Sequence, residues 1–171
     1  MKKLLLLLSL FATLFVVSCG DDEAPTLGLS GTIEFDGTTY TIANGLFSQS
    51  SNGGNTEATF FLADGEITAS TGGGVSSGNS TIVLSIVALA ANSTSLTSGN
   101  YATSTNTTEL NATLLVTTIN GSQTNARSAN VGGTIGISGS GSTYTLTFND
   151  IPFGQGTTLT GSVSGTYGSL D

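Results

Sequence analysis

The sequence predicts an all-β domain, either an antiparallel β-sandwich or a lipocalin-like β-barrel of about nine or ten strands. Three observations lead to this fold class. Short segments alternate apolar and polar residues, as half-buried strands do. Turn pairs such as Asp36-Gly37 and Asn120-Gly121 separate these segments. No segment beyond the first thirty residues has a convincing helical pattern.

The first hairpin is predicted at residues 31–42. Residues 31–35 and 39–42 alternate on either side of Asp36-Gly37, a pair that tolerates the positive φ angles of a tight turn. This pattern places Ile33, Phe35, Tyr40 and Ile42 in the core. Asp36 is assigned to turn geometry and not to catalysis, because aspartate before glycine is common in turns.

The next segments predict a strand, two loops and a second hairpin. Leu46 and Phe47 begin a strand, and residues 48–57 form a polar loop. Residues 58–62 are then expected to pair with residues 66–68 across a turn at residues 63–65. Residues 70–79, with three consecutive glycines, are expected to form a second long loop.

Two long strands are predicted in the middle of the chain, at residues 80–91 and 109–119. Both have apolar residues on both faces, which is typical of central, fully buried strands. A buried helix is the alternative for residues 80–91, but their β-branched content favours a strand. Asn120-Gly121 predicts a hairpin into residues 123–129, a polar strand that carries Arg127 and therefore belongs at an edge or in solvent.

The last third predicts strands at residues 131–138, 143–149 and 157–167. Gly161 and Gly165 alternate with inward-facing residues, which indicates strong curvature or the close approach of another element. The hairpins at 31–42 and 133–146 have similar sequences. If they are neighbours in space, the sheet closes on itself.

The chain starts with a segment that has the features of an export signal. Lys2 and Lys3 precede fourteen mostly apolar residues, 4–17, which is short for a permanent membrane span and suitable for a secretory signal. Val16-Val17-Ser18-Cys19 resembles the lipobox of bacterial lipoproteins. This resemblance implies that the Cys19 thiol takes a diacylglycerol, that the chain is cut before Cys19, and that fatty chains hold the protein on a membrane.

The residues after Cys19 resemble a second lipoprotein signal. Asp21, Asp22 and Glu23 follow Gly20, like the acidic tether that in some Gram-negative lineages sends lipoproteins to the outer face of the outer membrane. We therefore expect a signal peptide at 1–18, a lipidated cysteine and acidic tether at 19–30, and one all-β domain at 31–171. The expected location is the cell outer membrane, facing the exterior.

The composition of the processed chain excludes many kinds of chemistry. Cleavage before Cys19 removes 18 of 171 residues and leaves 153, with eleven acidic residues against one base, Arg127. This part has no histidine or lysine, so a hydroxyl nucleophile has no general base, and Cys19 is its only cysteine. One arginine cannot neutralise a phosphate backbone. We expect no enzymatic activity, no cofactor, no metal site and no nucleic-acid partner.

A carboxylate pair is the remaining catalytic possibility. The candidate acids of the domain are Glu34, Glu57, Asp64, Glu66, Glu109 and Asp150. A glycoside hydrolase needs two carboxylates facing each other across a cleft. Only Asp64 and Glu66 are brought together by local sequence, so this is the least favoured alternative.

The outward residues of several strands are hydroxylic instead of charged. Examples are Thr143, Thr145 and Thr147, and also Thr158, Thr160 and Ser162. The simplest interpretation is an uncharged solvated sheet surface. The alternative is a hydroxyl array for a repetitive partner such as glycan or ice, although the regular Thr-x-Thr repeat of ice-binding solenoids is missing.

The leading functional hypothesis is a non-enzymatic binding or accessory module of the cell envelope, with an envelope protein or a glycan as partner. The alternative is a barrel that holds a small apolar or glycan ligand in its interior. The sequence assigns no ligand-binding residues.

Overall fold

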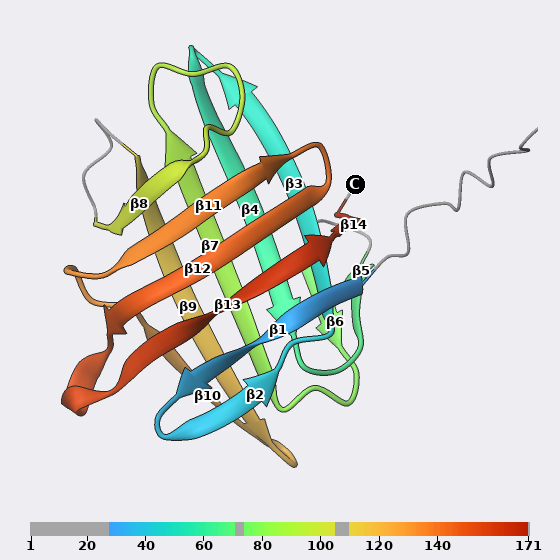
Figure 1. Cartoon of the computed structure of the whole chain (residues 1–171). Coiled ribbons are helices and arrows are strands. Elements are labelled where there is room, and N and C mark those ends of the chain that lie inside the picture. The colour runs from blue at the N-terminus through green and yellow to red at the C-terminus, as the bar shows by residue number, and fades with distance from the viewer. Residues whose placement is uncertain (1–27, 71–73, 105–109, 171) are drawn as a thin grey trace, which may run out of the picture.

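A computed structural model describes residues 28–70, 74–104 and 110–170, and it confirms the all-β fold (Figure 1). These residues form fourteen strands and one short 3-10 helix, η1. The elements are β1 Gly28–Phe35, β2 Thr38–Thr41, β3 Asn44–Asn52, β4 Asn55–Ala63, β5 Ile67–Ser70, β6 Gly74–Ser77, β7 Ile82–Ala90, β8 Gly99–Thr103, β9 Asn111–Asn120, β10 Gln123–Ser128, β11 Thr134–Ser140, β12 Thr143–Pro152, η1 Gly154–Gly156, β13 Thr158–Thr166 and β14 Gly168–Ser169.

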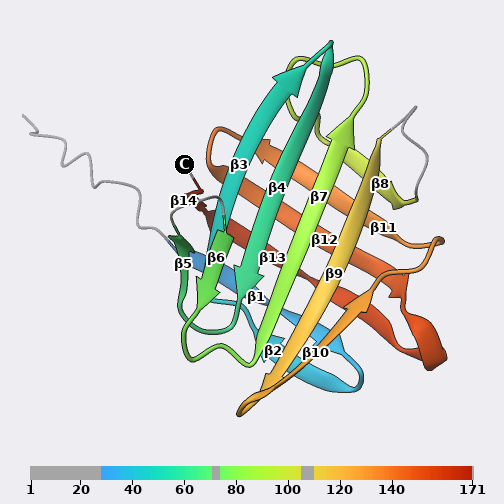
Figure 2. The same ribbon diagram turned by 180° about the vertical axis from the view of Figure 1, so that it is seen from behind.

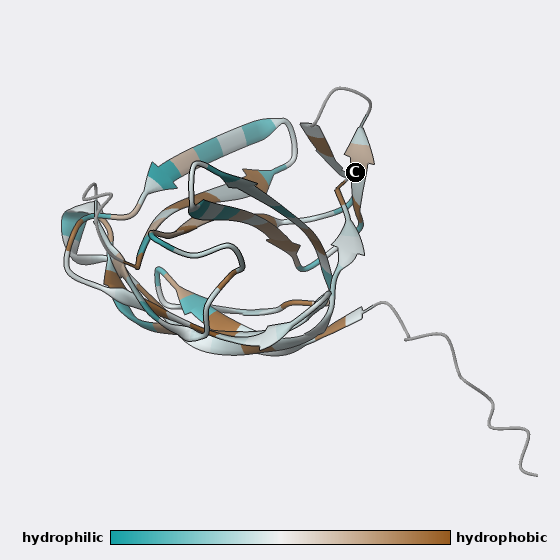
Figure 3. Ribbon diagram, turned by 90° about the horizontal axis from the view of Figure 1, so that it is seen from above, coloured by the Kyte–Doolittle hydropathy of each residue, from teal (hydrophilic) through white to brown (hydrophobic). Residues whose placement is uncertain are grey.

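Twelve strands belong to one curled sheet. Its order is β14-β3-β4-β7-β9-β8-β11-β12-β13-β1-β2, and β10 pairs with β9 off this path. Figures 1 and 2 show β3, β4, β7 and β9 as one layer that crosses a second layer made of β11, β12, β13 and β1. Seen from above, the layers curve around a common interior (Figure 3). Strands β5 and β6 form a separate small sheet.

The two ends of the curled sheet meet at Ile42 and Ala43. These two residues alone separate β2 from β3. The Ile42 amide donates to the carbonyl oxygen of Gly31 in β1 (3.0 Å), and the Ala43 amide donates to the carbonyl oxygen of Ala63 in β4 (3.1 Å). The chain thus passes from one layer to the other while it bonds to both.

The two similar hairpins predicted from sequence are close in space. Asp36 and Gly37 have φ angles of 55° and 72°, as a tight β1–β2 turn requires. Strand β13 lies between β1 and β12, so the β1–β2 hairpin and the β11–β12 hairpin share one layer. The two similar hairpins therefore belong to the same layer and lie on either side of β13.

Glycines in β1 and β13 allow this layer to pack closely. Gly161 has φ +127°, and a Cβ there would overlap the carbonyl oxygen of Thr32 in β1. It lies opposite Phe148 of β12, while Gly165 lies opposite Tyr144. Each of these two inward rings thus has a glycine beside it, and the overlap at Gly161 confirms the predicted close approach of a neighbouring element.

The inward side chains form one main core between the layers. Phe60 lies 5.4 Å from both Tyr144 and Tyr167, measured between ring centroids, and Phe47 is 4.8 Å from Phe60. A smaller cluster on the outside of β4 and β7 joins Leu46, Ala63 and Ile67. It forms where the β5–β6 sheet covers that face.

Residues 44–77 differ from their predicted arrangement. Most of the predicted loop at 48–57 is strand, because β3 and β4 pair along their whole length around a turn at Gly53 and Gly54. The predicted pairing of residues 58–62 with 66–68 is wrong, since β4 pairs with β3 and β7 while β5 pairs with β6. The predicted loop at 70–79 contains β6. These strands could not be recognised from the sequence, because apolar and polar residues do not alternate where a strand end is exposed to solvent on both faces.

The boundaries of the domain and the burial of its long strands also differ in detail. Strand β1 begins at Gly28, within the range assigned to the tether. Strand β7 is central, between β4 and β9, as predicted. Its outward residues, including Val83 and Val87, are only half-buried, because the other layer of the fold packs against the opposite face of β7. Among the described residues, no helix is long and apolar enough to cross a membrane.

Candidate functional site

The predicted anchor lies outside the described residues. Cys19 and the acidic residues Asp21, Asp22 and Glu23 belong to the part of the chain that precedes Gly28. Lipidation and export therefore stay predictions from the sequence. The possible sites of the described domain are its interior, its carboxylates and its two outer faces.

The interior is filled by side chains. Phe60, Tyr101 and Leu146 have no exposed surface, and the same is true of most inward residues of β4 and β7. Burial raises the pKa of the Tyr101 phenol, although its hydrogen bond to the Thr97 carbonyl oxygen opposes this rise. This packing does not support a ligand site between the layers.

Asp64 has a structural role at the start of β7. Its carboxylate accepts hydrogen bonds from the backbone amides of Thr81 (2.8 Å) and Ile82 (3.0 Å), and from the Thr81 hydroxyl. Glu66 is exposed, and its carbonyl oxygen accepts a hydrogen bond from Ser80 Oγ (3.0 Å). Of the pair favoured by sequence, Asp64 thus holds a strand in place. The described residues contain no group of three or more metal-ligating side chains.

Asp36 is paired with Arg127, and this was not predicted. The Arg127 guanidinium lies 3.3 Å from Asp36 Oδ2 and donates to Thr157 Oγ1 at 3.2 Å, and the Thr157 hydroxyl donates to Asp36 Oδ1. The Arg127 guanidinium also lies 5.9 Å from the centre of the Phe35 ring. Glu34 and Asp36 line one small polar groove. Because Arg127 and Thr157 engage Asp36, this groove has the features of a structural contact between β10 and the β1–β2 turn.

The hydroxyl residues form a broad outer face on the layer that contains β12 and β13. Their side chains bond to one another: Thr143 and Thr166 hydroxyls are 3.1 Å apart, and those of Thr147 and Ser162 are 3.3 Å apart. Ser162 Oγ also donates to the Leu146 carbonyl oxygen. Internal bonds of this kind leave fewer groups for a ligand. They favour the interpretation of this face as a solvated sheet surface.

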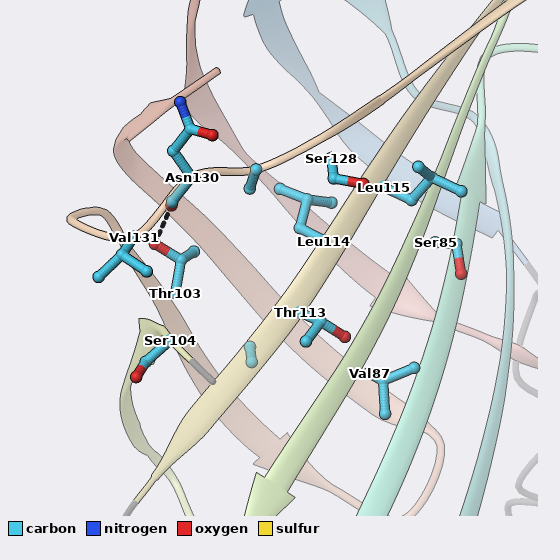
Figure 4. Close-up of a pocket in the computed structure, with 12 residues that line it drawn as sticks. Ser85, Val87, Thr103, Ser104, Thr113, Leu114, Leu115, Ser128, Asn130 and Val131 are labelled. Atoms are coloured by element: carbon cyan, nitrogen blue, oxygen red, sulfur yellow. Dashed lines mark hydrogen bonds between the residues drawn. The ribbon is translucent and has the colours of Figure 1, made fainter. Parts of the chain in front are cut away.

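The other outer face carries an apolar groove, which we call the β7–β9 groove (Figure 4). It has a volume of about 390 Å³. Its lining comes from β7, from β9, from the last residue of β8 and the one after it, and from the last residue of β10 and the segment that follows: Ser85, Val87, Thr103, Ser104, Ala112, Thr113, Leu114, Leu115, Ser128, Ala129, Asn130 and Val131. None of these residues is charged.

Two exposed side chains distinguish this groove from the rest of the surface. Among the described residues, the large apolar side chains that are exposed are Leu115 at 38% and Val131 at 70%. Both line the β7–β9 groove, and Val87, which also lines it, is half-buried. Neither Leu115 nor Val131 belongs to the two core clusters. Apolar surface gathered in one place often marks a contact with another molecule.

The segment that carries Val131 is held firmly. The Ala129 amide donates to the Leu114 carbonyl oxygen (2.8 Å), and the Asn130 amide donates to the Pro152 carbonyl oxygen (2.7 Å). Thr103 Oγ1 donates to the Asn130 carbonyl oxygen at 2.9 Å, as the dashed line in Figure 4 shows. These hydrogen bonds fix the position of the segment that lines one side of the groove.

The sequence contained one signal for this groove. Apolar residues on the second face of residues 80–91 and 109–119 were interpreted as buried, whereas part of that face is open.

Comparison of the chain with protein-family models, with curated proteins and with solved structures finds no match.

Proposed function

We propose that this protein is a lipoprotein of the Gram-negative outer membrane, held by lipid at Cys19 and facing the exterior. Its β domain acts as a non-enzymatic binding module that takes another envelope protein at the β7–β9 groove. The observation that carries the choice of surface is the gathering of Leu115 and Val131 in one uncharged groove.

The anchor part of the proposal is supported by the first 23 residues. Lys2 and Lys3, the short apolar segment and Val16-Val17-Ser18-Cys19 occur in the order that lipoprotein processing requires. A single acyl chain gives marginal attachment, while two or more give stable attachment. Acylation at both the thiol and the new amine would hold this acidic domain at a membrane surface.

The chemistry of the groove indicates a partner that presents an apolar side chain on an uncharged segment. The processed chain has eleven acidic residues and one base, so the protein as a whole repels strongly acidic partners. The groove has no charged residue to repel or to select a charged group. Its volume and apolar side chains suit an anchoring side chain of the partner, and its lining also includes serine and threonine residues.

Mass spectrometry of the protein purified from membranes tests the anchor. The expected product starts at Cys19 and carries the mass of the acyl groups, and Cys19→Ala should leave an uncleaved chain. A native product with an unmodified thiol at Cys19, or with its first 18 residues intact, would overturn the lipoprotein assignment.

Crosslinking in intact cells tests the groove. A photo-reactive residue at position 131 should capture one envelope protein, while the same residue at Ser164 on the hydroxyl face should not. Leu115→Ser combined with Val131→Ser should reduce co-purification of that protein at least tenfold, and Thr145→Ser serves as the control. Equal capture at positions 131 and 164 would count against the groove.

A further inference from the structure

Strand β10 has an open edge. Among the described strands it pairs with β9 alone, in a register that matches Gln123 with Asn120 and Ser128 with Leu115. The Ala129 amide bonds to the Leu114 carbonyl oxygen. Because hydrogen-bonded and non-bonded pairs alternate in antiparallel sheets, the backbone groups of Thr124, Ala126 and Ser128 point away from β9.

This edge lacks the usual protection against pairing. Proteins shield exposed strand edges with proline, lysine, bulges or outward charge. Strand β10 contains no proline or lysine, and its register with β9 runs without a shift. Its one charged residue, Arg127, is directed to Asp36 and the Phe35 ring. The edge therefore presents neutral backbone and small side chains.

The distribution of charge allows two copies to meet here. The chain has eleven acidic residues, yet residues 110–149 contain none. This segment includes β9, β10 and β11, and Arg127 is its only charged residue. Strand β10 therefore carries no carboxylate of its own, and the nearby Asp36 carboxylate is paired with Arg127. Two copies can meet along this edge without placing unpaired carboxylates of β10 opposite each other.

We propose that β10 pairs in antiparallel orientation with β10 of a second copy of this chain, around a twofold axis at Ala126. This register places Ala126 opposite its own copy and Thr124 opposite Ser128, so that all three outward-pointing residues bond across the axis. The β7-β9-β10 part of the sheet then continues into the second copy. One short strand pair gives a small interface, so the dimer forms in a concentration-dependent way.

Disulfide trapping of the full chain in mild detergent tests the register. Ala126→Cys should give a disulfide-linked dimer under mild oxidation, because directly opposed bonded residues have Cα atoms about 5.5 Å apart, within disulfide reach. Ser164→Cys is the matched control, since Ser164 is exposed on β13, which is paired on both sides. Both variants keep Cys19, so any background from it is common to them.

Sedimentation of proline and lysine variants tests the pairing itself. Ala126→Pro removes an outward amide and leaves the bonds to β9, and Ala126→Lys opposes two positive charges. Each should raise the dimer dissociation constant at least tenfold, while Ala126→Ser should leave it within twofold. Either variant that stays folded is sufficient. The proposal would be overturned if the wild-type protein is monomeric at every concentration, even if its β10 binds a segment of another protein. Equal disulfide trapping at positions 126 and 164 would also overturn it.

Discussion

At the scale of single residues, Tyr167 is the clearest conflict in the core. Its ring packs against Phe60 and Tyr144, but its buried hydroxyl has no hydrogen-bond partner among the described residues. Burial strongly raises the pKa of this phenol. An unsatisfied buried hydroxyl loses its bonds to water without replacement, so the ring stabilises the fold and the oxygen opposes it.

Replacing Tyr101 or Tyr167 by phenylalanine should change the free energy of unfolding differently. Tyr167→Phe removes an unsatisfied group and should raise the free energy of unfolding by about 1 kcal/mol, or leave it unchanged. Tyr101→Phe removes the 2.6 Å bond to the Thr97 carbonyl oxygen and should lower it by about 1 kcal/mol. Urea unfolding at neutral pH measures both. A larger loss for Tyr167→Phe than for Tyr101→Phe would show that its hydroxyl is bonded.

At the scale of elements, the contact between β1 and β13 depends on glycine. Gly31, Gly161 and Gly165 have φ angles between 127° and 146°, and a Cβ on each would meet backbone of the opposite strand. This arrangement makes room for Tyr144 and Phe148 on the inner face. The glycines are therefore part of the packing and not merely part of turns.

Gly161→Ala should destabilise the domain far more than Gly121→Ala. Both glycines have positive φ, but a Cβ at Gly121 would meet nothing within 4 Å. Gly121→Ala should lower the free energy of unfolding by about 1 kcal/mol, from backbone strain alone. Gly161→Ala adds steric overlap and should lower it by about 3 kcal/mol or more. Chemical denaturation compares them, and equal losses would mean that the β1–β13 approach is looser than described.

Sequence reasoning worked best for elements defined by neighbouring residues. The β1–β2 and β9–β10 hairpins were predicted because glycine turn pairs lie between alternating segments. The β3–β4 hairpin was missed because the residues around Gly53 and Gly54 are polar on both sides. For the same reason the β5–β6 sheet, which covers part of the outer face of β4 and β7, was not foreseen.

At the scale of the whole molecule, stability should fall at alkaline pH. Burial raises the pKa values of Tyr101, Tyr144 and Tyr167 above the value near 10 that tyrosine has in the unfolded chain. Above that pH the unfolded chain releases these protons and the folded domain keeps them. The stabilising contribution is therefore complete below about pH 10 and is lost as pH rises through the folded pKa values.

Urea midpoints measured between pH 8 and pH 11 would test this expectation. The midpoint should change little from pH 8 to pH 9 and then fall, and phenolate absorbance should increase together with unfolding. Tyr167→Phe should reduce the fall, because it removes the tyrosine whose pKa is raised most strongly. A midpoint that stays constant to pH 11 would show that these phenols ionise without unfolding.

The sequence by itself determined the all-β class, several of the hairpins, the inward faces and the small set of reactive side chains. These properties depend on residues that are adjacent in the chain or on composition. Only the tertiary structure decided the meeting of the sheet ends at Ile42 and Ala43, the pairing of Arg127 with Asp36 and the presence of the exposed Leu115 and Val131 in one groove. These depend on contacts between distant residues, which local periodicity does not encode.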